Sequence, residues 1–205
     1  MDYQYDVFLS YRRFGEWPNW VAEQFLPLFK HYLGERLGTE PRIAWDMELG
    51  AGASLPHAIA AKLAASKVLV ALFSRQYFAS PWCTAELGHM LARETMCQYR
   101  TLQRPAGLIV PAHVHDGEDV PELVSKILTL DLAPFVNVRA ARGSALLEGL
   151  AQMIDNWAGH IEQAINDAPP CDPNWPTLAY EDIQQKLTRN PKQADLPRLT
   201  GIKYV

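Results

Sequence analysis

The sequence predicts an α/β protein built on a doubly wound parallel sheet. Short apolar segments that suit buried strands alternate about five times with longer segments whose apolar residues recur at helical spacing. Apolar residues make up 48% of the 205 positions, which is enough for one well-packed domain and an appendage. Ligands of such folds bind beyond the carboxyl ends of the strands, so the loops that follow the strands are the expected place for a site.

The predicted strands are short, apolar and flanked by polar or turn-forming residues. They fall at residues 7–9, 42–45, 67–73, 107–114 and, with a weaker signal, within 127–138. The segment 67–73 (KVLVALF) is apolar almost throughout, as in a central strand that is covered on both faces. Pro111 fits poorly in a sheet interior, so we expect it at a strand end.

The predicted helices begin next to residues that suit a helix start. They fall at residues 19–33, 55–66, 81–99 and 144–165. Asn19, Ser54 and Ser80 are the expected N-caps, and Pro81 takes a first-turn position where its missing N–H costs nothing. Pro27 lies inside the first helix and is expected to kink or interrupt it.

The composition changes near residue 168. Six prolines fall in the last 38 residues, so we expect residues 1–167 to form the domain and residues 168–205 to form a proline-rich C-terminal extension. A short helix is predicted at 180–187. The extension is expected to wrap the domain, to link it to another part, or to dock on a partner.

Charge and cysteine content argue against several classes of protein. There are 19 Lys+Arg against 23 Asp+Glu, a net charge of −4, and the absence of a long basic run gives no support for binding to nucleic acid or to a membrane surface. Three scattered cysteines without C-x-x-C spacing argue against a disulfide framework or a zinc site. The acidic N-terminus does not resemble a signal peptide, and no apolar run approaches the roughly 20 residues of a membrane span. We therefore expect a cytoplasmic protein.

Three loops should meet at the carboxyl edge of the predicted sheet. The first carries residues 10–13 (SYRR), the second carries Trp45 and Asp46, and the third runs from Ser74 toward Glu86. Cationic, aromatic and carboxylate groups would converge there. Such a combination suits a ligand that has both a phosphate and flat rings.

Glu86 is the candidate reactive group at this edge. Trp82 and Glu86 are four residues apart on a predicted helix and therefore share a face, whereas Cys83, Leu87 and Leu91 share another that looks like core. Partial desolvation beside the Trp82 ring would tune the pKa of the carboxyl group. Taken alone, a solvated surface glutamate remains the more common interpretation.

Other candidate groups carry weaker signals. Arg12 and Arg13 match a diphosphate in geometry, but a surface salt bridge is the simpler interpretation of either. The loop at residues 50–52 (GAG) fits neither the Walker pattern nor the dinucleotide fingerprint, and it is better interpreted as an interaction loop. His113 and His115 alternate on one strand without further ligands, so no metal site is predicted. Cys83 lacks a nearby base and is expected to be a small buried apolar group.

The motifs together resemble TIR (Toll/interleukin-1 receptor-like) domains of the NAD-cleaving bacterial type. Residues 5–13 (YDVFLSYRR) resemble the first box of that family, and Asp46 with residues 49–59 resembles the second. Residues 73–87 are similar to the S-x-x-Y…S-x-W-C-x-x-E-L segment of its enzymatic members. The resemblance covers about residues 3–165, and its strength comes from three boxes in order at matching spacing.

The resemblance implies a fold, a catalytic residue and a set of binding residues. The fold is a flavodoxin-like five-stranded parallel sheet with helices on both faces, and the catalytic carboxylate is Glu86. The implied substrate-binding residues are Ser10, Tyr11, Arg12, Arg13, Trp45, Asp46, Ser74 and Trp82. Some NAD-cleaving relatives have an aromatic residue two places before the second-box aspartate, where this chain has Ala44 with Trp45 adjacent.

The loop of the second box is implied to take part in self-association, because relatives of this kind often become active only on assembly. Its candidate contact residues are Leu49, Gly50 and Gly52. A separate effector or sensor protein is a further expected partner. A stand-alone enzyme of this length would suit bacterial defence against phage.

The implied reaction needs one carboxylate and neither a metal nor a cofactor, with NAD as the substrate. Glycoside hydrolysis usually requires an acid, but the pyridinium group of NAD leaves as neutral nicotinamide without being protonated. The carboxylate then stabilises a positive ribose. The product stays open between ADP-ribose and cyclic or conjugated forms.

Two other functional classes were compared with this one. A non-catalytic TIR interaction module needs neither Glu86 nor Trp82, and the presence of both favours an enzyme. A response-regulator receiver would require acidic residues where Ser10 and Ser74 stand, and it is rejected.

Overall fold

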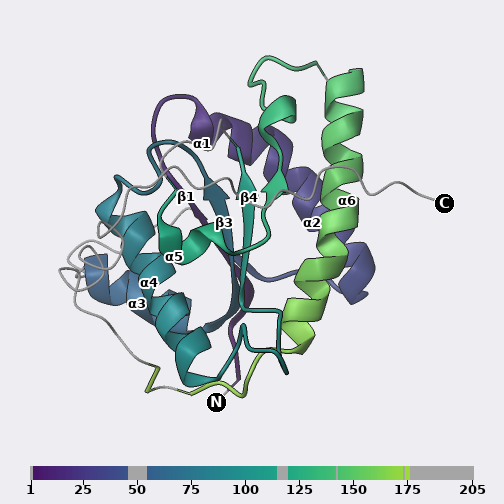
Figure 1. Cartoon of the computed structure of the whole chain (residues 1–205). Coiled ribbons are helices and arrows are strands. Elements are labelled where there is room, and N and C mark those ends of the chain that lie inside the picture. Colours follow the sequence, from purple (N-terminus) through teal and green to yellow (C-terminus); the bar gives the residue numbers. More distant parts are fainter. Residues whose placement is uncertain (1, 46–54, 115–119, 142, 173, 176–205) are drawn as a thin grey trace.

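The computed structural model describes residues 2–45, 55–114, 120–141, 143–172 and 174–175. Its centre is a parallel sheet of five strands in the order β2-β1-β3-β4-β5 (Figure 1). The strands are β1 Tyr5–Tyr11, β2 Ile43–Ala44, β3 Ser66–Phe73, β4 Ile109–His113 and β5 Leu130–Asp131. This is the flavodoxin-like strand order, in which the chain reverses direction across the sheet between β1 and β3. The predicted fold class is confirmed.

Helices cover both faces of the sheet (Figure 1). They are α1 Trp17–Trp20, α2 Leu26–Leu37, α3 Leu55–Ala64, α4 Pro81–Met96, α5 Glu122–Ser125 and α6 Ala145–Asn166, with a π-helical turn at Val21–Phe25 and a 3-10 turn at Ala133–Phe135. α2 packs against α6 on one face, and α3 packs against α4 on the other. Within the described part of the chain, no helix is long and apolar enough to cross a membrane.

The first helix starts earlier than the sequence predicted. Its N-cap is Glu16, and Asn19 lies inside α1, where its side-chain amide donates to the Glu16 carboxylate at 2.8 Å. The predicted interruption at Pro27 is confirmed as a π-helical turn just before it, in which the Leu26 N–H bonds to the Val21 carbonyl. A wider turn fits here because proline has no N–H and crowds the preceding turn.

Strand β1 is longer than predicted and includes Ser10 and Tyr11, which were expected in a loop. These residues pair with Ala71 and Leu72 of β3. Because both lie in a ladder between two neighbouring strands, their backbone positions are fixed by the sheet itself.

Pro111 lies inside β4, opposite Ala71, and the prediction that it marks a strand end is wrong. Leu69 N–H donates to Leu108 O, and Val114 N–H donates to Phe73 O. The backbone N–H and C=O groups of the even-numbered residues along β4 therefore point toward β3, and those of the odd-numbered residues point away from it. The missing N–H of Pro111 therefore faces the β5 side. Pairing with β5 begins only at Ala112, so no ladder bond is lost.

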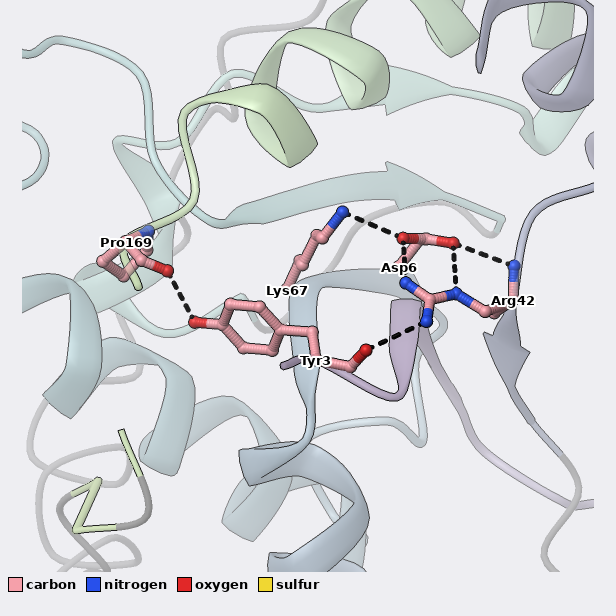
Figure 2. Close-up of polar contacts among 5 residues, drawn as sticks. All are labelled: Tyr3, Asp6, Arg42, Lys67 and Pro169. Atoms are coloured by element: carbon pink, nitrogen blue, oxygen red, sulfur yellow. Dashed lines mark hydrogen bonds and ion pairs between the residues drawn. The ribbon is translucent and has the colours of Figure 1, made fainter. Parts of the chain in front are cut away.

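The amino ends of the strands are joined by a charged cluster (Figure 2). The Arg42 guanidinium donates to both Asp6 carboxylate oxygens, at 3.1 and 2.9 Å, and Lys67 Nζ lies 3.0 Å from Asp6 Oδ1. Burial alone would raise the pKa of Asp6, but hydrogen bonds from Arg42 and Lys67 lower it to about 2. The cluster thus ties β1 to the segment before β2 and to β3, at the edge opposite the predicted site.

The chain continues past α6 along this same amino edge. The Tyr3 phenol donates to Pro169 O at 3.0 Å (Figure 2), and the Tyr99 phenol donates to Asp167 O at 2.5 Å. The Trp175 side chain is buried, with the Arg93 guanidinium 4.6 Å from its ring centroid. Residues 167–172 and 174–175 are therefore packed against the sheet domain. The predicted helix at 180–187 lies outside the described residues.

Candidate active site

Glu86 lies at the carboxyl edge of the sheet, where the sequence predicted a site. Ser80 caps α4 by accepting a hydrogen bond from the Cys83 N–H, and Pro81 follows in the first turn, as predicted. This start places Glu86 in the second turn of α4. There the Ser10 hydroxyl donates to Glu86 Oε2 at 2.5 Å. Since Ser10 belongs to β1 and α4 follows β3, the contact spans the reversal point of the sheet.

Tyr77 completes the contact from the other side of Ser10. Its phenol oxygen lies 2.8 Å from Ser10 Oγ, and the side chain is fully buried. Tyr77 was not among the site residues that the sequence predicted. The only available signal was its position in the S-x-x-Y segment, because a buried tyrosine of the core gives the same apolar pattern.

The pKa of Glu86 is raised from 4.5 to about 7. Burial is the main cause, because it disfavours the ionised form, and the Ser10 hydrogen bond and the charge of Arg13 act in the opposite direction. The side chain is half-buried. The group therefore changes protonation state near neutral pH, as is typical of catalytic carboxyl groups. The predicted tuning by partial burial is present, and the hydrogen bond that the structure gives Glu86 comes from Ser10.

Polar groups of the segments that follow β1 and β3 lie at the same edge of the sheet as this carboxyl group. Arg12 Nη1 donates to Ser80 Oγ at 3.3 Å, which brings the loop after β1 onto the cap of α4. Arg12 Nε and Ser74 Oγ are buried and have no hydrogen-bond partner among the described residues. Buried polar atoms of this kind are normally satisfied, so a ligand or water is the expected partner of each.

The remaining predicted binding residues lie in varied environments. Tyr11 is buried in β1, Arg13 is exposed, and Trp45 is half-buried just after β2. Trp82, in the first turn of α4, is 38% exposed although it is a large aromatic side chain. Direct hydrogen bonds thus join Ser10 to Glu86 and Arg12 to Ser80.

Several predicted residues lie outside the part of the chain that the structure describes. They are Asp46, Leu49, Gly50, Gly52, the predicted cap Ser54, and His115.

Two alternative chemistries gain no support here. Cys83 is buried, and burial raises the pKa of its thiol to about 12, so the nucleophilic thiolate is absent at neutral pH. Among the described residues, no group of three or more metal-binding side chains is close enough to hold an ion.

Two solved structures that contain TIR domains are similar to this chain. The TIR domain of the Toll-related receptor TRR-2 from Hydra magnipapillata is 19% identical, with a TM-score of 0.46 over 62% of this chain and 84% of that one. The TIR domains of the activated Roq1 resistosome, which recognises the pathogen effector XopQ, are 20% identical, with a TM-score of 0.40 over 91% of this chain and 98% of theirs. Comparison with curated proteins finds no significant match.

The family assignment rests on a family model. The model described as TIR domain matches residues 7–147, which is more than two thirds of the chain and includes most of β1, Glu86 and the start of α6. The chain belongs to the TIR domain family.

Proposed function

We propose that this TIR domain cleaves the bond between nicotinamide and ribose in NAD, with Glu86 as the catalytic carboxylate. The observation that carries the proposal is the position of Glu86: a half-buried carboxyl group at the carboxyl edge of the sheet, fixed by Ser10. Its pKa is about 7, and buried polar atoms of Arg12 and Ser74 at the same edge have no hydrogen-bond partner among the described residues. Both features support a reactive site more than a surface glutamate.

A single carboxylate is sufficient for this reaction. The C1′–N bond breaks with its electron pair moving to the pyridinium ring, so nicotinamide leaves neutral and needs no proton donor. Positive charge develops on the ribose, and an ionised carboxylate next to it stabilises that charge. Attack by water then gives ADP-ribose, whereas attack by an adenine nitrogen or an added nucleophile gives a cyclic or conjugated product.

The surrounding residues match the parts of NAD that remain. Arg12 and Arg13, at the end of β1, supply guanidinium groups for the diphosphate. Ser74 offers a buried hydroxyl whose oxygen lacks a partner, and Trp45 and Trp82 offer aromatic surface for the flat rings. Asp46, by the family match, belongs to the same binding set.

We propose that the active form is an assembly of protomers, with contacts from Leu49, Gly50 and Gly52. This rests on the family resemblance and on a small-residue loop without an evident folding role. Such an enzyme would act in the cytoplasm in bacterial defence, in response to a separate sensor or effector. The test is to measure the assembly size of Gly52→Pro by light scattering, together with its rate of turnover. If both equal those of the wild type, the proposed contact is rejected.

The reaction itself is tested with the purified full chain at high concentration, incubated with NAD. We expect nicotinamide release, loss of release in Glu86→Gln, and normal release in the control Glu148→Gln, whose side chain is exposed on α6. The mass of the co-product separates hydrolysis from cyclisation. Release by Glu86→Gln at the wild-type rate would reject the proposal, and a chain without turnover under assembling conditions would fit a non-catalytic interaction module.

A further inference from the structure

The Ser10 hydroxyl group lies between two oxygen atoms. It is 2.5 Å from Glu86 Oε2 and 2.8 Å from the Tyr77 phenol oxygen. A serine hydroxyl carries one proton, and an ionised carboxylate only accepts hydrogen bonds. When Glu86 is ionised, the Ser10 proton therefore lies on the side of Glu86, and Tyr77 must be the donor to Ser10. The hydrogen bonds then run in one direction, from Tyr77 through Ser10 to Glu86.

Both hydroxyl groups are held in place by the backbone and the core. Ser10 is 1% exposed and pairs with Ala71 in the ladder between β1 and β3. The Tyr77 N–H donates to Ser74 O at 3.0 Å, and its ring packs edge-on against Phe73 with centroids 5.0 Å apart. Among the described residues, Ser10 is the hydrogen-bond partner of the Tyr77 phenol. The phenol is thus rigidly aimed at Ser10.

We propose that Tyr77 is a positioning residue: its phenol donates to Ser10 and so keeps the Ser10 hydroxyl directed at the Glu86 carboxylate. The catalytic consequence rests on the proposed function, whereas the arrangement itself does not. Without the phenol, Ser10 loses the neighbour that orients and polarises its hydroxyl group. The ionised form of Glu86 is then less well stabilised, and the carboxylate is less firmly fixed beside the substrate.

None of the charged or titratable groups near Glu86 replaces Tyr77 in orienting the Ser10 hydroxyl group. From the loop after β1, the positive charge of Arg13 favours the ionised carboxylate. From α4, Cys83 stays neutral, because burial raises its pKa to about 12. Burial also holds the pKa of Tyr77 well above its usual range, so Tyr77 acts as a hydrogen-bond donor and not as a charge. Arg12 Nη1 donates to Ser80 Oγ at the cap of α4.

The direct test is a pH titration of Glu86, monitored by NMR. The full chain carries carbon-13 at the glutamate carboxyl carbons. The Glu86 signal is the one missing from Glu86→Gln. In Tyr77→Phe, which keeps the ring, we expect the titration midpoint of Glu86 to rise by about half a pH unit or more. The control is Tyr3→Phe, which removes a phenol bonded to Pro169 O at the opposite edge and should leave the midpoint unchanged. Equal midpoints in wild type and Tyr77→Phe would overturn the proposal.

The route through Ser10 is tested by a double-mutant cycle. Ser10→Ala should raise the Glu86 midpoint by about one pH unit or more, because a hydrogen bond to a charged group is lost. Adding Tyr77→Phe to Ser10→Ala should then have no further effect. An added rise as large as that in the wild-type background would overturn the proposed route.

The titration does not depend on turnover, so the two proposals can fail separately. A midpoint shift in Tyr77→Phe without nicotinamide release from any variant would support the positioning role and reject the proposed reaction. Nicotinamide release that is lost in Glu86→Gln, together with an unshifted Glu86 midpoint in Tyr77→Phe, would support the proposed reaction and reject the positioning role. If both hold, the pH dependence of turnover in Tyr77→Phe moves upward by the same amount as the midpoint.

Discussion

A half-buried carboxyl group is easier to keep neutral than ionised, and Glu86 shows the consequence. Burial raises its pKa to about 7, while Ser10 and the charge of Arg13 limit the rise. In the folded protein the group therefore keeps its proton to higher pH than in the unfolded chain. A catalytic carboxylate in this position has a cost in stability, which offers a test at the level of the single residue.

Glu86→Gln should stabilise the fold in a pH-dependent way. Below the unfolded pKa of 4.5, Glu86 is neutral in both states, so its charge contributes no difference. Between pH 4.5 and about 7 the unfolded chain loses the proton while the folded protein keeps it, which lowers the stability of the wild type by about 3 kcal/mol. Urea unfolding of both proteins at pH 4 and pH 8 measures this. An advantage of Glu86→Gln that is equal at the two pH values would contradict the assigned pKa.

At the scale of the elements, the two edges of the sheet have different chemistry. The amino edge is closed by paired charges, with Asp6 held by Arg42 and Lys67 (Figure 2). The carboxyl edge holds Glu86 and unpartnered polar atoms. Stability and the proposed reaction therefore depend on opposite ends of the same strands.

Asp6→Asn should weaken the fold at neutral pH by about 2 kcal/mol, because the folded pKa of Asp6 is about 2 against 3.8 in the unfolded chain. Because the pKa of Asp6 is lower in the folded protein, ionised Asp6 stabilises the fold above pH 3.8. That contribution disappears as the pH falls toward 2. The free energy of unfolding of Asp6→Asn should differ from that of the wild type by a large amount at pH 7 and by a small amount at pH 2.5. The control Asp155→Asn removes an exposed pair with Arg36 and should cost less than about 1 kcal/mol. Equal losses for both variants at pH 7 would contradict this account.

Periodicity and capping residues predicted most elements because they report local structure. Ser80 caps α4 as predicted, the amphipathic segment 144–165 forms α6, and the apolar segment that ends at Phe73 is the central strand β3. The errors arise where the pairing of neighbouring strands determines which residues are tolerated. Pro111 is tolerated inside β4 because its missing N–H faces the side where β5 has not yet begun to pair. No local pattern around Pro111 carries that information.

At the scale of the whole molecule, the described residues that follow α6, 167–172 and 174–175, pack against the domain. Trp175 covers Arg93, whose guanidinium donates to Ser66 O at 2.8 Å and to Leu63 O at 3.0 Å. Arg93 is 2% exposed, so its charge depends on these carbonyl groups and on the Trp175 ring. The end of α3 and the start of β3 are thereby linked to residue 175.

Trp175→Ala should lower the free energy of unfolding by about 2 to 4 kcal/mol, because it uncovers apolar surface and the Arg93 guanidinium. Nicotinamide release per folded molecule should stay at the wild-type level, since Trp175 lies at the amino edge. Leu102→Ala, at a side chain that is 97% exposed, should change stability by less than about 0.5 kcal/mol. A Trp175→Ala protein as stable as wild type would show that the segment contributes little.

The candidate site was predicted from the sequence only in outline. The topology rule placed the loops after β1 and β3 at one edge, and the family motif singled out Glu86. The contact between Ser10 and Glu86 joins residues 76 positions apart, and Tyr77 enters from the core. These contacts depend on strand register and on side-chain packing, which the spacing of residues in the chain does not encode.

The most direct test of the central claim is the rate of nicotinamide release from NAD between pH 5 and pH 9, for the wild type and for Glu86→Gln. If ionised Glu86 stabilises the positive ribose, kcat/KM of the wild type rises with pH, with a midpoint near 7, and then levels off. Glu86→Gln should show no such rise and a rate lower by about a hundredfold or more. A wild-type rate that falls with pH over this range, or a Glu86→Gln rate equal to that of the wild type, would contradict the account.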